Sequence, residues 1–185
     1  TAEIVLITVT EPHHRRTRIK DDAAPDGERT QVLKLNISEK FQTGIYDYSV
    51  MTSVFSRLDF AATERPFPLR KLSLSSQEWC GHVYHQVLPM AATPERPPQW
   101  QSQSHSYFDG EADEQRLLPA PPGEAVAEDE LPLLLRTYAQ RRELLVSHRK
   151  AGGSTLQLFR VAAPLAEPEP LTDAAEPVRR ATWEP

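Results

Sequence analysis

The sequence predicts a mainly β fold, a curved antiparallel sheet or half-open barrel with one packed helix. Segments dense in β-branched and aromatic residues recur along the chain, whereas residues 129–140 have the pattern of an amphipathic helix. Successive strands with few helices favour a sandwich or barrel-like closure. We expect a single β-rich domain at 1–185, because a chain of 185 residues can bury one sizeable core.

The first strand is expected at residues 3–10, EIVLITVT, whose nearly continuous apolar run is typical of a strand that is buried on both faces or packed under other structure. The next stretch, 13–20, carries three arginines and one lysine without an acid. It can form a patch for phosphate or anionic lipid headgroups, or a solvated hairpin arm. The four acids between residues 21 and 28 favour the hairpin arm, and Pro25-Asp26-Gly27 predicts its turn.

Two further strands are predicted at residues 31–37 and 45–57. The first alternates in residue type and should pair with the opening strand, and the second is rich in tyrosine, valine and phenylalanine. Tyr46 and Tyr48 share one face of the second strand, because strand side chains alternate with a period of two. Such a row of tyrosines forms either an amphipathic sheet face or a stacking platform for a ligand.

The stretch 72–87, LSLSSQEWCGHVYHQV, is interpreted as a central strand. Alternation would place Cys80 and His82 side by side on one face and Trp79 on the other. Gly81 indicates a bulge or the close approach of another group. An imidazolium beside a thiol lowers the pKa of that thiol, so Cys80 and His82 are the alternative catalytic pair. The other interpretation is that Cys80 is a small buried hydrophobe, the commonest role of a free cysteine.

Cys80, His82 and His85 also carry donor atoms that zinc accepts. On a single strand His85 would face away from the other two, so the three could converge only through a turn. We therefore predict no metal site and no cofactor, with these three residues as the alternative set of ligands.

Proline marks the expected surface connections, because it lacks an amide donor and fixes the φ angle. Proline-rich loops are predicted at 89–98, 119–123 and 164–177. The helix at 129–140 is expected to begin with Asp129 as its cap, since acids crowd its first turn, where the helix dipole favours them.

Between these loops an extended stretch is expected at 100–108. The acidic stretch 109–114 is interpreted as a solvated turn, because it lacks the ligand spacing of an EF-hand calcium loop. A hairpin around Gly152-Gly153 and an edge strand at 178–183 complete the predicted elements.

Three strings of the sequence together resemble a known family. They are TGIY-x-YS-x-M-x-SVF at 43–55, QEWCGH at 77–82 and SYFDGEAD at 106–113. They are similar to those of a family of uncharacterised bacterial envelope lipoproteins, often labelled septum formation inhibitor, and the resemblance covers roughly residues 3–136. It implies a location on the periplasmic side of the bacterial cell envelope. It also implies attachment to a membrane, such as the outer membrane, only through a lipid anchor outside this chain.

The composition excludes several classes of function. A net charge of −5 argues against general nucleic-acid affinity, and one cysteine cannot form an intramolecular disulfide. From the family resemblance, the aromatic-rich strands and the missing catalytic constellation we predict a non-enzymatic cell-envelope protein that binds a lipid, another apolar ligand or another envelope protein. The alternative is a Cys/His-dependent hydrolase or thiol enzyme that uses Cys80 and His82. The predicted ligand-binding residues are Tyr46, Tyr48, Glu78, Trp79, Cys80 and His82.

Overall fold

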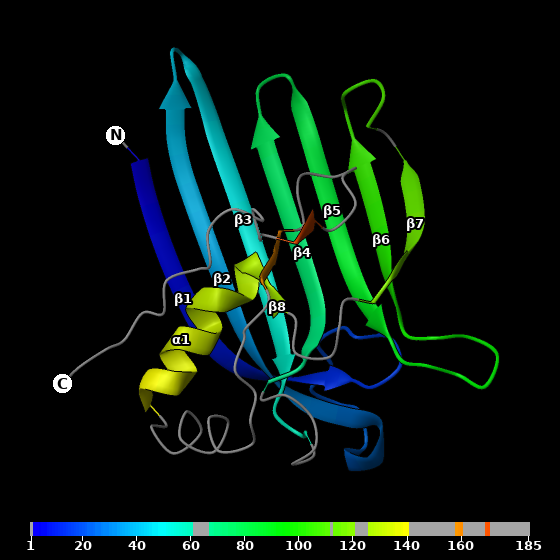
Figure 1. Ribbon diagram of the computed structural model, residues 1–185. Coiled ribbons are helices and arrows are strands. Elements are labelled where there is room, and N and C mark those ends of the chain that lie inside the picture. The colour runs from blue at the N-terminus through cyan, green and yellow to red at the C-terminus, as the bar shows by residue number, and fades with distance from the viewer. Residues whose placement is uncertain are drawn as a thin grey trace.

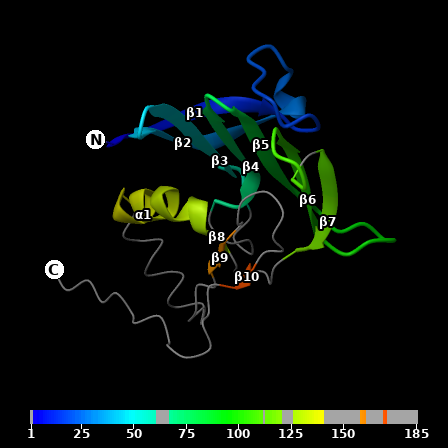
Figure 2. The ribbon, with the colours of Figure 1, turned by 90° about the horizontal axis from the view of Figure 1, so that it is seen from above.

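The computed structural model describes residues 2–60, 67–111, 113–120, 126–140, 158–160 and 169–170. Seven antiparallel strands form one curved sheet, in which each strand lies beside its neighbour in the sequence (Figure 1, Figure 2). They are β1 (Ala2–His14), β2 (Arg29–Thr43), β3 (Tyr46–Arg57), β4 (Leu69–Glu78), β5 (Gly81–Met90), β6 (Gln99–Ser106) and β7 (Glu114–Pro119). The predicted mainly β fold is confirmed, and the sheet is not closed into a barrel, since β1 and β7 form its two edges.

The remaining described elements are short. A second sheet has the order β10-β9-β8 and contains β8 (Val126–Ala127), β9 (Leu158–Arg160) and β10 (Glu169–Pro170). One 3₁₀ turn, η1 (Asp26–Glu28), lies between β1 and β2, and another, η2 (Glu128–Glu130), leads into α1 (Leu131–Gln140). None of the helices in the described ranges is long and apolar enough to cross a membrane.

The predicted helix at 129–140 forms, but Asp129 is not its cap. A 3₁₀ turn precedes α1, and the buried carboxylate of Glu130 accepts a hydrogen bond of 2.8 Å from the backbone N–H of Ala127. The tighter turn brings the third acid, rather than the second, back over the preceding amide. The turn thus satisfies a backbone donor where the chain leaves β8.

A row of directly paired side chains forms the centre of the hydrophobic core. Leu35, Val54, Leu72 and Val87 are successive cross-strand partners on β2, β3, β4 and β5, and all four are buried. Leu133 of α1 belongs to the same cluster, so the helix packs on this face of the sheet (Figure 2). Each such side chain contributes about 1.5–3 kcal/mol when it is removed from water.

The opposite face of the sheet is largely polar from β4 to β7. Ser73, Gln86, Gln103 and Gln115 are cross-strand partners along these strands. The amide of Gln86 donates to Oε1 of Gln103 at 3.3 Å, which satisfies part of the row. Strand alternation therefore separates one core face from one polar face, as is common for antiparallel sheets.

The first strand is not buried on both faces, so that prediction was wrong. β1 lies at the edge of the sheet and pairs with β2, and Ile4 and Leu6 are 57% and 55% exposed. An apolar, β-branched run indicates that a segment forms a strand, but it carries no information about the lateral place of that strand. The order of strands, which depends on pairing with distant residues, decided the burial of this segment.

The connection between β1 and β2 forms an arm in which acids lie against bases. Lys20 pairs with Asp22, and Arg29 pairs with Asp26. The η1 turn begins at Asp26, directly after Pro25, where the turn was expected. Exposed ion pairs of this kind stabilise a protein by about 1 kcal/mol or less. They therefore neutralise the charge of the arm but contribute little to its stability.

Several predicted loops and strands contain part of a strand or lie partly or wholly outside the described residues, among them the loop at 119–123, of which only 119–120 are described. Of the loop at 89–98, the first two residues complete β5, and the following residues lead to β6. Residues 169–170 within the loop at 164–177 form β10. The turn at Gly152-Gly153 and the strand at 178–183 fall outside the described ranges.

Removing a member of the core row should destabilise the protein strongly. We expect Leu35→Ala to lower the free energy of unfolding by about 2–5 kcal/mol, because it leaves a cavity between β2 and its neighbours. The matched control is Leu117→Ala on β7, where the leucine is 51% exposed. This substitution should change the free energy of unfolding by about 0.5 kcal/mol or less. Urea unfolding measures both. Equal losses in the two variants would contradict this account of the core.

Candidate functional site

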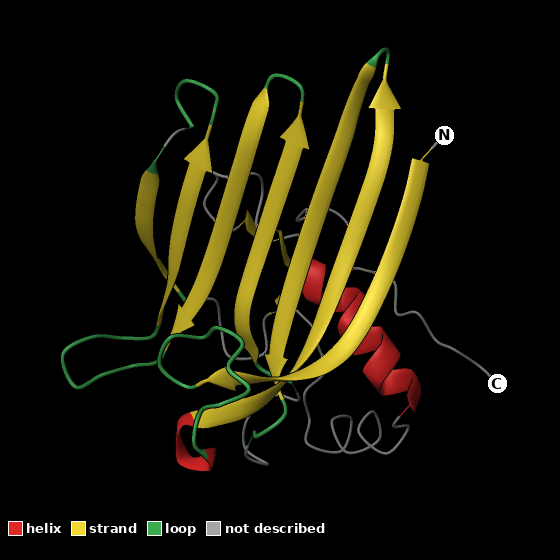
Figure 3. Ribbon diagram, turned by 180° about the vertical axis from the view of Figure 1, so that it is seen from behind, coloured by secondary structure: helices red, strands yellow, loops and turns green. Residues whose placement is uncertain are grey.

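Three hairpin tips lie together at one end of the sheet (Figure 1, Figure 3). They join β2 to β3, β4 to β5 and β6 to β7, because an up-and-down sheet places alternate connections at the same end. Neighbouring tips are two strands apart, or about 9.6 Å at the usual strand spacing. The strings TGIY, QEWCGH and SYFDGEAD each fall on one of these tips.

The stretch 72–87 forms a hairpin, not the predicted single strand. β4 ends at Glu78 and β5 begins at Gly81, and these two residues are cross-strand partners around the turn Trp79-Cys80. Because the chain reverses at this two-residue turn, the cross-strand partners Leu72 and Val87 share a face, although alternation along one strand would place them on opposite faces. The reversal changes which residues of the hairpin share a face.

The faces of β5 follow from this turn. Val87 and the buried His85 lie on the core face with Leu72, whereas His82 lies opposite Gln77 on the other face. The expectation that Cys80 and His82 stand side by side on one strand was therefore wrong. Cys80 belongs to the turn, and His82 is the second residue of the next strand.

Aromatic side chains link the three tips into one row, through ring contacts at the first two tips and the contact of Tyr107 with Gly81. The Tyr46 ring lies edge-on to the Trp79 ring, with centroids 5.5 Å apart. Tyr107 lies against Gly81, where an added Cβ would come within 2.3–2.6 Å of the Tyr107 side chain, and this confirms the predicted close approach. Tyr107 in turn meets the Phe108 ring with centroids 5.6 Å apart. The side chains of Trp79 and Tyr107 nevertheless remain 62% and 67% exposed.

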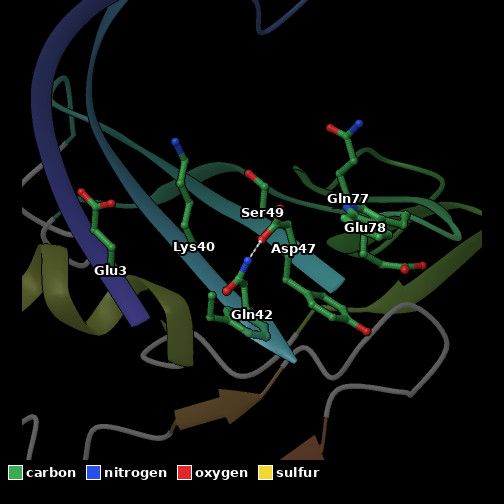
Figure 4. Close-up of a pocket in the computed structure, with 10 residues that line it drawn as sticks. Glu3, Lys40, Gln42, Asp47, Ser49, Gln77 and Glu78 are labelled. Carbon is green, nitrogen blue, oxygen red and sulfur yellow. Dashed lines mark hydrogen bonds between the residues drawn. The ribbon is translucent and has the colours of Figure 1, made fainter. Parts of the chain in front are cut away.

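A cleft of about 610 Å³ lies between the first two tips and the start of β1 (Figure 4). Its apolar part contains the stacked rings of Phe41 and Tyr48, with centroids 5.0 Å apart and an interplanar angle of 3°. On its polar part Gln42 donates a hydrogen bond of 2.6 Å to Asp47. The lining residues are Glu3, Lys40, Phe41, Gln42, Asp47, Tyr48, Ser49, Gln77, Glu78 and Trp79.

The predicted ligand-binding residues divide into three groups. Tyr48, Glu78 and Trp79 line the cleft, and Tyr46 touches it through the Trp79 ring. Cys80 and His82 are exposed on the second hairpin but do not belong to the lining. The main residue that the sequence analysis missed is Phe41. It is the cross-strand partner of Tyr48, which follows from the hairpin around Gly44 once its turn is assigned.

The turn at Gly44 explains that pairing. Thr43 and Tyr46 are the flanking partners, which leaves Gly44-Ile45 as a two-residue loop with a φ of 65° at the glycine. Positive φ at the first loop position is the requirement of a type II′ turn and favours glycine. The loop projects Ile45 outward and sets Phe41 against Tyr48 two residue pairs below.

The environment of Cys80 opposes formation of a thiolate. Cys80 is exposed, and its backbone N–H donates a hydrogen bond of 2.8 Å to Oε2 of Glu78. The neighbouring Glu78 carboxylate stabilises the protonated thiol and raises the pKa of Cys80. A nucleophilic cysteine needs the opposite shift, from a neighbouring positive charge.

His85, the third member of the alternative metal set, is buried in the sheet. Its Nε2 lies 2.8 Å from Oγ of Ser102, and burial lowers the pKa of the imidazole. His82 and His85 lie on opposite faces of β5. Within the described residues, no group of three or more histidine, cysteine, aspartate or glutamate side chains is placed to hold a metal ion.

Comparisons with models of protein families, with curated proteins and with solved structures find no match to this chain. The resemblance to envelope lipoproteins stays a prediction.

The Tyr107 side chain should prevent any residue larger than glycine from fitting at position 81 without loss of stability. We expect Gly81→Ala to lower the free energy of unfolding by about 1–3 kcal/mol, because the new methyl group overlaps the inner atoms of the Tyr107 side chain. Gly27→Ala is the matched control, since a Cβ there meets nothing within 4 Å. In urea unfolding, Gly81→Ala should cost much less in a Tyr107→Gly background than in wild type, because only glycine at 107 removes the Cβ as well as the ring from the space of the new methyl group. Independent, additive losses would contradict the contact.

The Cys80 thiol should become more reactive when its neighbouring charge is removed. We expect Glu78→Gln to speed alkylation by iodoacetamide at pH 7.5, because loss of the carboxylate lowers the pKa of the thiol and raises the fraction of thiolate. Asp109→Asn, on a different tip, should leave the rate unchanged. Mass spectrometry of the native protein follows the modification. Equal rates in wild type and Glu78→Gln would refute the assigned role of this carboxylate.

Proposed function

We propose that the protein is a non-enzymatic bacterial cell-envelope protein that binds a lipid or another apolar ligand at the three hairpin tips. The observation that carries this proposal is the aromatic row together with the adjoining cleft. Exposed apolar side chains on soluble proteins are usually scattered singly. Here Ile45, 70% exposed, projects from the same end of the sheet as Trp79 and Tyr107.

The cleft at the end of the β2–β3 hairpin combines apolar rings on the core face with polar side chains on the opposite face. The stacked rings of Phe41 and Tyr48 offer a flat apolar surface, and Trp79 extends it toward the second tip. Lys40 and Gln42 supply polar groups to the cleft from the opposite face of the hairpin. A volume of about 610 Å³ falls within the usual range for small-molecule sites, about 300–1,000 Å³.

The envelope location is supported by the family resemblance. Each of its three strings includes one of the three tips, so the residues that resemble those of envelope lipoproteins include the residues of the aromatic row. Tyrosine and tryptophan side chains have an apolar body and a polar group, and they suit boundaries between apolar and aqueous surroundings. Another envelope protein is the alternative occupant of the tips.

A hydrolase or thiol enzyme based on Cys80 and His82 has weaker support. The carboxylate beside Cys80 raises the pKa of the thiol, whereas a nucleophile needs a lowered one. In addition, Cys80 lies in the turn and His82 lies on β5, so the two residues do not stand side by side on one strand. The cleft, by contrast, supports binding without chemistry.

Loss of the stacked ring should weaken ligand binding. With a dansylated fatty acid as the probe, we expect Tyr48→Ala to raise the Kd about tenfold, because the variant loses an aromatic contact surface. Tyr84→Ala, whose hydroxyl donates to Gln86 on the other face of the sheet and which does not line the cleft, should leave the Kd unchanged. Fluorescence titration measures both.

The same variants distinguish the occupants. Native mass spectrometry of the purified protein should find a bound mass of several hundred daltons that Tyr48→Ala and Trp79→Ala both reduce. If wild type binds no probe and both variants retain the same mass as wild type, the ligand-binding proposal is wrong and the tips contact a protein instead.

A further inference from the structure

Arginine side chains gather at the end of the sheet opposite the hairpin tips. A cavity of about 370 Å³ lies there, lined by Arg18 from the β1–β2 connection, Arg57 at the end of β3 and Arg70 near the start of β4. The rest of its wall is mostly apolar and includes Leu69, Pro89, Met90, Pro98 and Trp100. This local concentration of positive charge stands out in a chain whose net charge is −5.

A β-bulge brings Arg70 to this cavity. Phe55 opposes Lys71, but the next residue, Ser56, opposes Leu69, so Arg70 is the extra residue of β4. The Nη2 of Arg70 donates hydrogen bonds to two backbone carbonyls at the end of β1 and the start of the following connection. These bonds are 2.9 Å to the oxygen of His14 and 2.7 Å to the oxygen of Arg15.

The charges near Arg70 are predominantly positive. Among the described groups that act on it, Arg18, Arg57 and Arg15 repel its guanidinium, and Asp59 attracts it. Asp59 is itself 2.9 Å from Arg15 and 3.7 Å from Arg57. Burial, and then the charge of Arg18, lower the pKa of Arg70 to about 10, and burial lowers the pKa of Arg18 as well. Both guanidiniums stay charged at neutral pH, so their burial costs free energy that a bound anion would offset.

Two of these arginines also have a buried N–H donor that makes no hydrogen bond to the described residues. The Nη1 of Arg18 and the Nε of Arg70 are buried and have no hydrogen-bond partner among the described residues. Buried donors are normally satisfied, and each one that is not costs about 1–3 kcal/mol. The unused donors and the unbalanced charge therefore occur on the same two side chains.

We propose that this cavity binds a phosphate group, with Arg18 and Arg70 donating hydrogen bonds to its oxygens and Arg57 adding positive charge. The planar guanidinium matches the geometry of phosphate oxygens and is the side chain most suited to this task. The apolar wall would contact an organic group if the phosphate is carried as an ester. The site lies at the other end of the sheet from the ligand cleft and shares no residue with it, so either proposal can fail alone.

Isothermal titration calorimetry of the whole chain at constant ionic strength tests the site, with inorganic phosphate and phenyl phosphate as probes. We expect Arg18→Gln to raise the Kd for phosphate about tenfold or more, because it removes a charged donor. Arg16→Gln, an exposed neighbour outside the cavity, should keep the Kd within about twofold. Tighter binding of phenyl phosphate would identify an ester as the ligand, and equal binding would identify free phosphate. No binding of either probe, or equal losses in the two variants, would overturn the proposal.

A second variant separates loss of binding from loss of folding. Ala91 lines the cavity, so Ala91→Glu would supply a carboxylate to the arginines. We expect this variant to lose phosphate binding and to have a higher Tm than Ala91→Gln, in phosphate-free buffer. A gain in stability cannot come from misfolding. A Tm for Ala91→Glu at or below that of Ala91→Gln would overturn the proposal, because the arginines would then gain nothing from a counter-charge.

Discussion

The cross-strand row of Leu35, Val54, Leu72 and Val87 is the contact on which the rest of the sheet depends. Each residue is the direct partner of the next, so a slip of one residue in any strand would turn an apolar set toward the polar face. The row thereby sets the register of four strands at once. That register determines which residues occupy the hairpin tips and where the bulge at Arg70 falls.

The up-and-down order of the strands gives the two ends of the sheet different chemistry. Connections that alternate along the chain meet at the same end, so residues 45, 79 and 107 come together although they are far apart in the sequence. The other end collects Arg18, Arg57 and Arg70 in the same way. An apolar, aromatic end and a cationic end are thus consequences of one topology, and the two proposed binding sites are therefore separate.

Part of the candidate site could be predicted from the sequence, and the physical basis differs between residues. The shared face of Tyr46 and Tyr48 follows from strand alternation alone, and the close approach at Gly81 follows from the missing side chain. The relation of Cys80 to His82 could not be predicted in this way, because Cys80 lies in a two-residue turn and His82 on the strand that follows it, so strand alternation does not connect them. The stacking of Phe41 on Tyr48 required the register of a hairpin.

The sequence by itself determined the class of fold, most of the strand-forming segments and the place of the helix, because these depend on residue types and their spacing over short distances. Only the tertiary structure decided that β1 lies at an exposed edge, that 72–87 reverses direction at Trp79-Cys80, and that the arginines share a cavity. Each of these outcomes depends on pairing between segments far apart in the chain. Local pattern carries no information about that pairing, because the same alternation suits several strand orders.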